Sequence, residues 1–139
     1  MADDESAAFG TVTRLRRLTD TELETYDLIP VEISRRVWLL QVPILPGPYN
    51  GLTLSRFVVV DEIIDPAESS ILLAHELVHV RQYHELGLPR FAWRYNVAFV
   101  RGLVRLRNWN KAYRAIPAEA EARQQAGLWA KPQPDQAGL

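Results

Sequence analysis

The stretch ILLAHELVHV, residues 71–80, decides the fold of this chain and the chemistry it can support. On an α-helix, side chains four positions apart lie one above the other on one face. His75 and His79 have this spacing, so both imidazoles can point at one metal ion. Glu76 lies about 100° further round the helix, where its carboxylate can reach a water molecule on that metal. The pentapeptide predicts a zinc site that activates water, provided that it lies on a helix.

The residues on either side of the pentapeptide predict that helix. Asp65 is a good N-cap, Pro66 is favoured at the first helical position, and Glu68 can bond back to the cap. Gly87 supplies the stop, so we expect a helix from about Pro66 to Leu86. Its middle is almost entirely apolar and should be buried. Buried imidazoles need partners, which a metal provides; the alternative is core histidines bonded to backbone carbonyls.

The remaining histidine, His84, does not fit the same site. It is nine positions after His75 (84 minus 75), which places it about 180° away on the helix. We expect it at the surface, near the helix C-terminus, where a partly positive imidazole is favourable.

Composition predicts one ordinary globular domain. The chain has 139 residues, of which 47% are hydrophobic and 24% charged. The net charge of −1 gives no electrostatic indication of binding to nucleic acid or to an anionic membrane. Cysteine is absent, so metal ligands must be His, Asp or Glu.

The start of the chain and its composition bear on where the protein is located. The first residues, Met1-Ala2-Asp3-Asp4-Glu5, are acidic and no apolar stretch follows them, so no secretory leader is evident. Together with the absence of cysteine, this favours a cytoplasmic location. The most apolar later segment, residues 91–104, contains two arginines, so no membrane span is expected.

Periodicity and turn residues predict an α+β domain, a small antiparallel sheet followed by three helices, with the metal site on the central helix. A capping box at Thr19–Glu22 predicts a short helix to about Leu28. The remaining predicted elements are strands at 37–42, 52–54 and 57–60, and helices at about 89–108 and 117–127. We expect the domain to span 11–127, with a flexible N-terminus at 1–10 and a flexible Pro-containing tail at 128–139.

A catalytic zinc ion usually has three protein ligands, and the third must come from elsewhere in the chain. Glu119 and Glu121 stand at the start of the predicted helix at 117–127, about 200° apart, so only one can face the metal. Ala122 lies on the same face as Glu119 and would allow that helix to approach closely. This favours Glu119, with Glu121 as the alternative. A third possibility is that both residues only favour a helix N-terminus.

HExxH followed by Glu119-x-x-Ala122, 40 positions after His79 (119 minus 79), resembles the gluzincin metallopeptidases, and the chain is similar in size to the single-domain minigluzincins. The resemblance implies a zincin-like fold and a Zn²⁺ ion bound by His75, His79 and Glu119. It implies Glu76 as general base and a peptide or protein as substrate. It also implies that the strand at 57–60 borders the cleft and pairs with an extended peptide.

Larger gluzincins add an Asp that orients a metal-binding histidine. Here Arg123 follows Ala122 where such a residue might stand.

Several other residues are candidates for the site. Tyr113 and Arg114 precede the helix at 117–127, and either could polarise the substrate carbonyl; Tyr95 is a further candidate. For each, the alternative is packing or surface solvation. Gln82, close to His79 on the same helix, is a candidate for a hydrogen bond that orients a ligand.

Two functions stay open at this point. The first is a zinc-dependent metallopeptidase. The second is a catalytically silent or latent zinc-binding domain with a structural or protein-interaction role. The sequence leaves the oligomeric state and the cleavage specificity undetermined.

Overall fold

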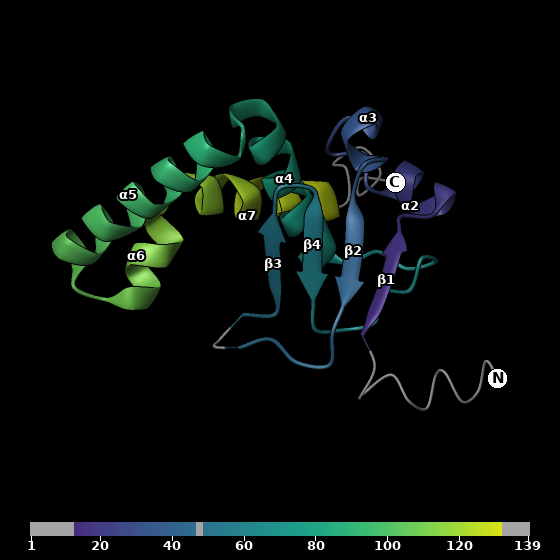
Figure 1. The fold of residues 1–139 in the computed structure, drawn as a ribbon, viewed down its shortest axis with the longest axis horizontal. Helices are drawn as coiled ribbons and strands as arrows, with labels where there is room; N and C mark the ends of the chain where they lie inside the picture. The colour runs from purple at the N-terminus through teal and green to yellow at the C-terminus, as the bar shows by residue number, and fades with distance from the viewer. Residues whose placement is uncertain (1–12, 47–48, 132–139) are drawn as a thin grey trace.

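A four-stranded mixed sheet forms one layer of the protein (Figure 1). The computed structural model describes residues 13–46 and 49–131. The strands lie in the order β1-β2-β4-β3. They are β1 (Arg14–Arg17), β2 (Trp38–Gln41), β3 (Gly51–Leu54) and β4 (Phe57–Val60). β1 runs antiparallel to β2, and β3 antiparallel to β4, whereas β2 and β4 are parallel.

The α+β class is confirmed, but the expectation of an antiparallel sheet is wrong for one strand pair. The short turn at Ser55, which has a positive φ of 57°, makes β3 and β4 a hairpin. Val58 and Val60 of β4 are fully buried, whereas β3 alternates between half-buried and exposed residues. The more apolar β4 therefore takes the inner position against β2, and β3 becomes the edge strand. The strand β1 was not predicted, because its sequence, RLRR, lacks the apolar pattern of a strand.

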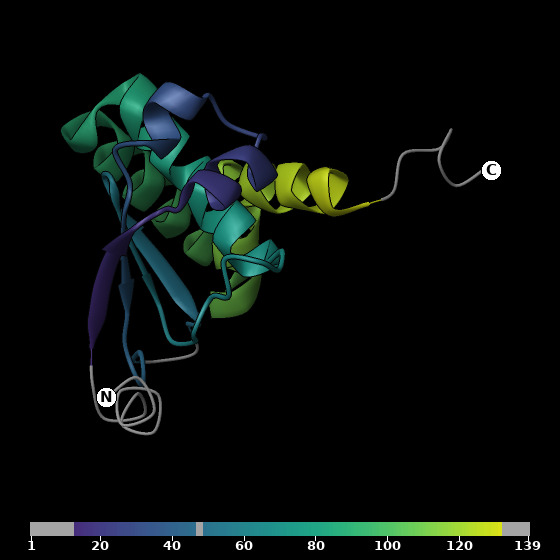
Figure 2. The same ribbon diagram turned by 90° about the vertical axis from the view of Figure 1, so that its right-hand side faces the viewer.

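The helices cover one face of this sheet (Figure 2). They are α2 (Asp20–Thr25), α3 (Val31–Ser34), α4 (Ile71–Leu86), α5 (Leu88–Leu106), α6 (Trp109–Ala115) and α7 (Pro117–Ala130). Leu73 and Leu77 of α4 belong to the same buried cluster as Leu39 of β2 and Val58 of β4. α4 is therefore the central helix, packed between the sheet and α7.

α4 begins later than the sequence predicts. Its N-cap is Ser70, whose hydroxyl accepts a hydrogen bond from the Leu73 amide at 3.2 Å. Asp65 makes a local turn instead: its carboxylate accepts from the Ala67 amide at 2.9 Å. Asp65 therefore stabilises a turn and not the start of the helix; Asp side chains are favourable in both positions, so the sequence did not distinguish them. The predicted C-terminus is confirmed, with Gly87 at a positive φ of 82°.

Within the described residues, four helices follow the sheet where three were predicted. Arg107 adopts a left-handed conformation that ends α5, and the Asn108 side chain caps α6 by accepting from the Lys111 amide at 3.0 Å. α6 packs closely on α5 because Gly102 has no side chain: a Cβ there would lie 3.3 Å from Ala112 Cα. A short helix begun by Asn was not recognised in the sequence.

α7 begins at Pro117, as predicted, but runs past Gly127 to Ala130. Trp129 stacks on Tyr26 at 5.1 Å and donates to the Thr25 carbonyl at 3.1 Å. Residues 128–130, predicted to belong to the tail, are therefore part of the helix. The predicted flexible segment 1–10 and the remainder of the tail, 132–139, lie outside the described residues.

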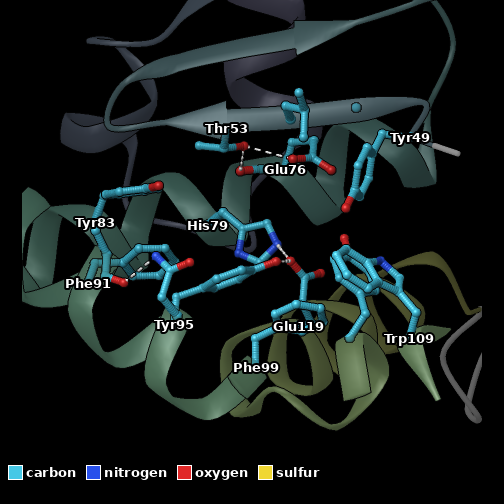
Figure 3. Close-up of a pocket in the computed structure, with 15 residues that line it drawn as sticks. Tyr49, Thr53, Glu76, His79, Tyr83, Phe91, Tyr95, Phe99, Trp109 and Glu119 are labelled. Carbon is cyan, nitrogen blue, oxygen red and sulfur yellow. Dashed lines mark hydrogen bonds and ion pairs between the residues drawn. The ribbon is translucent and has the colours of Figure 1, made fainter. Parts of the chain in front are cut away.

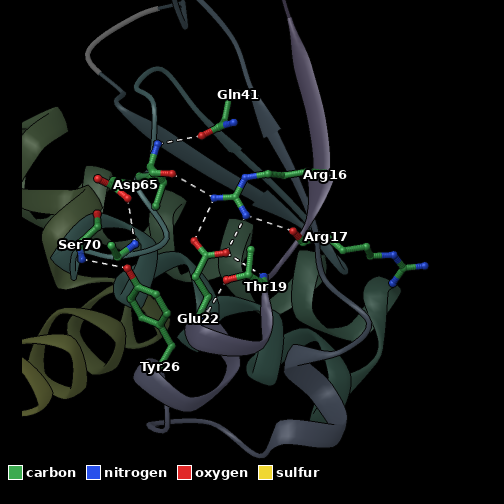
Figure 4. A network of polar contacts seen from close by, with 10 residues as sticks. Arg16, Arg17, Thr19, Glu22, Tyr26, Gln41, Asp65 and Ser70 are labelled. Carbon is green, nitrogen blue, oxygen red and sulfur yellow. Dashed lines mark hydrogen bonds and ion pairs between the residues drawn. The ribbon is translucent and has the colours of Figure 1, made fainter. Parts of the chain in front are cut away.

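A partly buried ion pair joins β1 to α2 and to the segment before α4 (Figure 4). Both carboxylate oxygens of Glu22 accept from the Arg16 guanidinium, at 2.6 and 2.9 Å. Arg16 also donates to the Ile64 carbonyl, and the predicted capping box at Thr19 is present. Burial alone would raise the pKa of Glu22, but its hydrogen bonds to Arg16 and Thr19 outweigh burial and hold that pKa below its usual range.

Candidate metal centre

The central helix brings His75 and His79 onto one face, as their spacing predicts. Their ring centroids are 5.0 Å apart. His79 is buried, and His75 is partly open to solvent. The neighbouring residues Leu73, Leu77 and Val78 are fully buried, so the helix is held firmly and its polar face is fixed toward α7.

α7 brings Glu119 directly onto this pair of histidines. Its Oε1 lies 3.0 Å from His75 Nε2, and its Oε2 lies 3.2 Å from His79 Nε2. The three potential ligand atoms all lie within 4.8 Å of one another. The close approach is possible because Ala122, one turn further along α7, is small and fully buried. Among the described residues, this is the one group of three or more His, Asp or Glu side chains that could hold a metal ion.

The contacts of Glu119 favour its ionised form. Burial would raise its pKa, but hydrogen bonds with His75, His79 and Tyr95 lower the pKa far below its usual range. The shortest of these contacts is that of the Tyr95 hydroxyl, which donates to Glu119 Oε2 at 2.6 Å. Tyr95 therefore holds the carboxylate in place from α5.

The alternative carboxylate, Glu121, points to a different set of partners. It accepts from the Gln82 amide at 2.6 Å and from Arg81 at 2.9 Å. Gln82 in turn contacts His79 Nδ1 through its Oε1 at 2.8 Å. Because the amide nitrogen of Gln82 is committed to Glu121 and to the Ala118 carbonyl, its oxygen faces the ring. His79 Nδ1 is then the donor to Gln82, and Nε2 is the ring nitrogen that faces Glu119.

Glu76 lies on the other side of His79 from Glu119, beneath the edge strand β3 that carries Thr53 (Figure 3). Its carboxylate accepts from the Thr53 hydroxyl at 2.8 Å. Burial raises the pKa of Glu76, and the neighbouring His79 and Thr53 only partly offset this. Gly51 makes the approach of β3 possible, since a Cβ there would lie 3.1 Å from Glu76 Oε2.

Thr53 and Gly51 were not recognised as site residues in the sequence.

Two cavities meet at the site. One, of about 450 Å³, is lined mainly by aromatic side chains, among them Tyr83, Phe91, Phe99 and Trp109. The other, of about 600 Å³, extends along α4 and α7 past His75. Glu76, Glu119 and Tyr113 line both, so the candidate metal centre opens into a continuous cleft beside β3.

The predicted electrophiles lie in different surroundings. Tyr113 is half-buried, its ring 5.8 Å from that of Tyr49, and burial followed by the charge of Glu119 raises its pKa well above the usual range. Arg114 is exposed and lies at the border of the larger cavity. Arg123, also exposed there, donates to the Arg114 carbonyl and contacts neither histidine at hydrogen-bond distance. His84 is exposed and remote from the cluster, as predicted.

One expectation about the cleft is wrong. β4 (Phe57–Val60) is paired on both sides, with β2 and with β3, so it has no free edge for a peptide. The strand that borders the cleft is β3, whose Gly51, Leu52 and Thr53 line the aromatic cavity.

Comparison of the chain with protein families, with curated proteins and with solved structures gave no match. None of the helices in residues 13–46 and 49–131 has the length and apolarity needed to cross a membrane. Any function must therefore be inferred from the side chains of the site.

Proposed function

We propose that this chain is a small gluzincin-like zinc metallopeptidase. The observation that carries the proposal is the convergence of two imidazole nitrogens and one carboxylate within 4.8 Å, next to a second buried carboxylate that is not part of the cluster. This donor set, in a chain without cysteine, suits zinc and leaves a coordination position for water. His75, His79 and Glu119 would hold the ion.

A zinc ion at this position would supply an acidic water molecule and a Lewis acid for the substrate carbonyl. Proton transfer and the positioning of the carboxylates depend on residues of the chain. Glu76 accepts the proton of the attacking water and returns it to the leaving amine, a role that its burial and raised pKa favour. Thr53 holds the Glu76 carboxylate in position, and Tyr95 does the same for Glu119.

An extended peptide would bind along β3, which is an edge strand beside the cleft. The aromatic cavity next to it offers a place for a large apolar side chain of the substrate.

The proposal is tested by metal content and cleavage together. We expect the purified full chain to contain equimolar zinc and to cut peptides in a mixed unstructured library, with products identified by mass spectrometry. Cleavage should stop on addition of a zinc chelator and return when zinc is restored. Zinc without any cleavage would favour the silent or latent zinc domain, and absence of zinc binding would contradict both functions.

Tyr113 is the better candidate for stabilising the carbonyl oxygen, because its side chain lines both cavities together with Glu76 and Glu119. We expect Tyr113→Phe to lower kcat/KM by about 10²-fold, as loss of one oxyanion donor does. Arg114→Gln should have a smaller effect, since Arg114 is exposed. A larger loss in Arg114→Gln, measured on the same peptide, would reverse the assignment.

A further inference from the structure

The outer face of α5 carries two parallel rows of exposed side chains that the proposed activity does not use. At about 100° per residue, the exposed side chains of Trp93, Val100 and Val104 share one stripe of the helix with the half-buried Val97. Trp93 and Val104 are each 72% exposed, and Val100 is 57% exposed. Next to this stripe runs a row of exposed arginines, made of Arg90, Arg94, Arg101 and Arg105. The opposite face of the same helix, with Phe91 and Tyr95, lines the cleft.

Within the described residues, only one member of the arginine row, Arg94, has acidic neighbours: it lines a pocket together with Glu85 and Glu121. Every charged residue between Glu85 and Glu119 in the sequence is Arg or Lys. None of the four arginines makes an ion pair within the part of the chain that the structure describes. Three of them, with Trp93, line an open groove between α5 and the junction of α6 with α7, and that groove has no acidic lining residue. The net charge of −1 therefore hides a strongly segregated charge distribution.

We propose that this face of α5 docks on an anionic lipid surface, with the apolar stripe in the boundary between headgroups and acyl chains and the arginine row on lipid phosphates. A helix with arginines on one side and Trp and aliphatic residues beside them is typical of helices that lie in a membrane interface. Tryptophan prefers that depth, and the long arginine side chains reach the phosphates from it. Figure 1 shows α5 running out past β3, so its outer face is not covered by the sheet.

Other occupants fit these two rows less well. A second copy of the chain would bring arginine rows together with no acidic residue on α5 or α6 to pair with them. A nucleic acid would satisfy the arginines but offers no apolar layer for Trp93, Val100 and Val104. A bilayer with anionic headgroups satisfies both rows at once.

The test uses the full chain and vesicles of phosphatidylglycerol or of phosphatidylcholine in a sedimentation assay. We expect the chain to bind phosphatidylglycerol vesicles and not phosphatidylcholine vesicles, and we expect salt to weaken this binding. Arg101→Gln/Arg105→Gln should lower the partition constant by roughly 25-fold, since each arginine near an anionic surface contributes about fivefold. The matched control is Arg35→Gln/Arg36→Gln, which removes the same charge from exposed positions at the end of α3 and should bind as the parent does.

A second measurement reports on the apolar stripe. Vesicles should shift the tryptophan emission to shorter wavelength, and Trp93→Phe should abolish that shift. Circular dichroism should be the same for every variant, because all substituted side chains are exposed. Failure to bind phosphatidylglycerol, equal losses in the two arginine pairs, or equally tight binding to duplex DNA would overturn the proposal.

Discussion

Glu76→Gln is expected to abolish peptide cleavage while leaving zinc bound. The amide cannot accept the proton of the attacking water, and loss of a general base typically lowers the rate by about 10²–10⁴-fold. Zinc should remain because Glu76 is outside the group formed by His75, His79 and Glu119. The fold should also remain, since the glutamine oxygen can still accept from the Thr53 hydroxyl that now bonds to Glu76.

Glu85→Gln is the matched control for this experiment, because it makes the same change at an exposed position on the same helix. Kinetics on one reporter peptide and zinc content by mass spectrometry should be measured for both variants. Full cleavage by Glu76→Gln, or an equal loss in Glu85→Gln, would contradict the general-base role.

Glu119→Gln is expected to remove most of the zinc affinity, whereas Glu121→Gln should retain it. The Glu119 carboxylate lies 3.0 and 3.2 Å from the two histidine Nε2 atoms, while Glu121 contacts Gln82 and Arg81. Loss of a ligand should cost more than the 10–100-fold in affinity typical of residues that only orient ligands. Glu121→Gln leaves the three ligands intact and should change affinity by less than that.

Competition with a fluorescent chelator measures both zinc affinities, and circular dichroism checks the fold. Stoichiometric tight zinc in Glu119→Gln would exclude Glu119 as a ligand. A greater loss in Glu121→Gln would favour the alternative carboxylate. His75→Ala should lose zinc under the same conditions, and unchanged metal content in that variant would contradict the site as a whole.

Features encoded by neighbouring residues could be predicted from the sequence. The Thr19 capping box, the end of α4 at Gly87 and the start of α7 at Pro117 all depend on residues within one or two turns. The choice of Glu119 over Glu121 also followed from local geometry, because the two lie on different faces of one helix. The structure places Glu119, and not Glu121, against the histidines.

Features set by distant contacts could not be predicted in the same way. Parallel pairing of β2 with β4 depends on which strand is the more completely buried, and that is a property of the assembled layers. Thr53 and Gly51 enter the site only because β3 becomes the edge strand over α4. The sequence contains the arginine row of α5 in a stretch without acidic residues, but the overall net charge averages this stretch with the acidic remainder of the chain and so does not indicate it.

The position of the three candidate ligands in the chain would link metal binding to the folding of α5 and α6. His75 and Glu119 are 44 residues apart, and both helices of that segment lie between them. An ion shared by α4 and α7 would bind the folded chain in preference to the unfolded one, because its ligands come together only when the segment between them is folded. Metal affinity and the stability of the α5–α6 hairpin would then be two measures of one equilibrium, so a substitution that strengthens either should strengthen both.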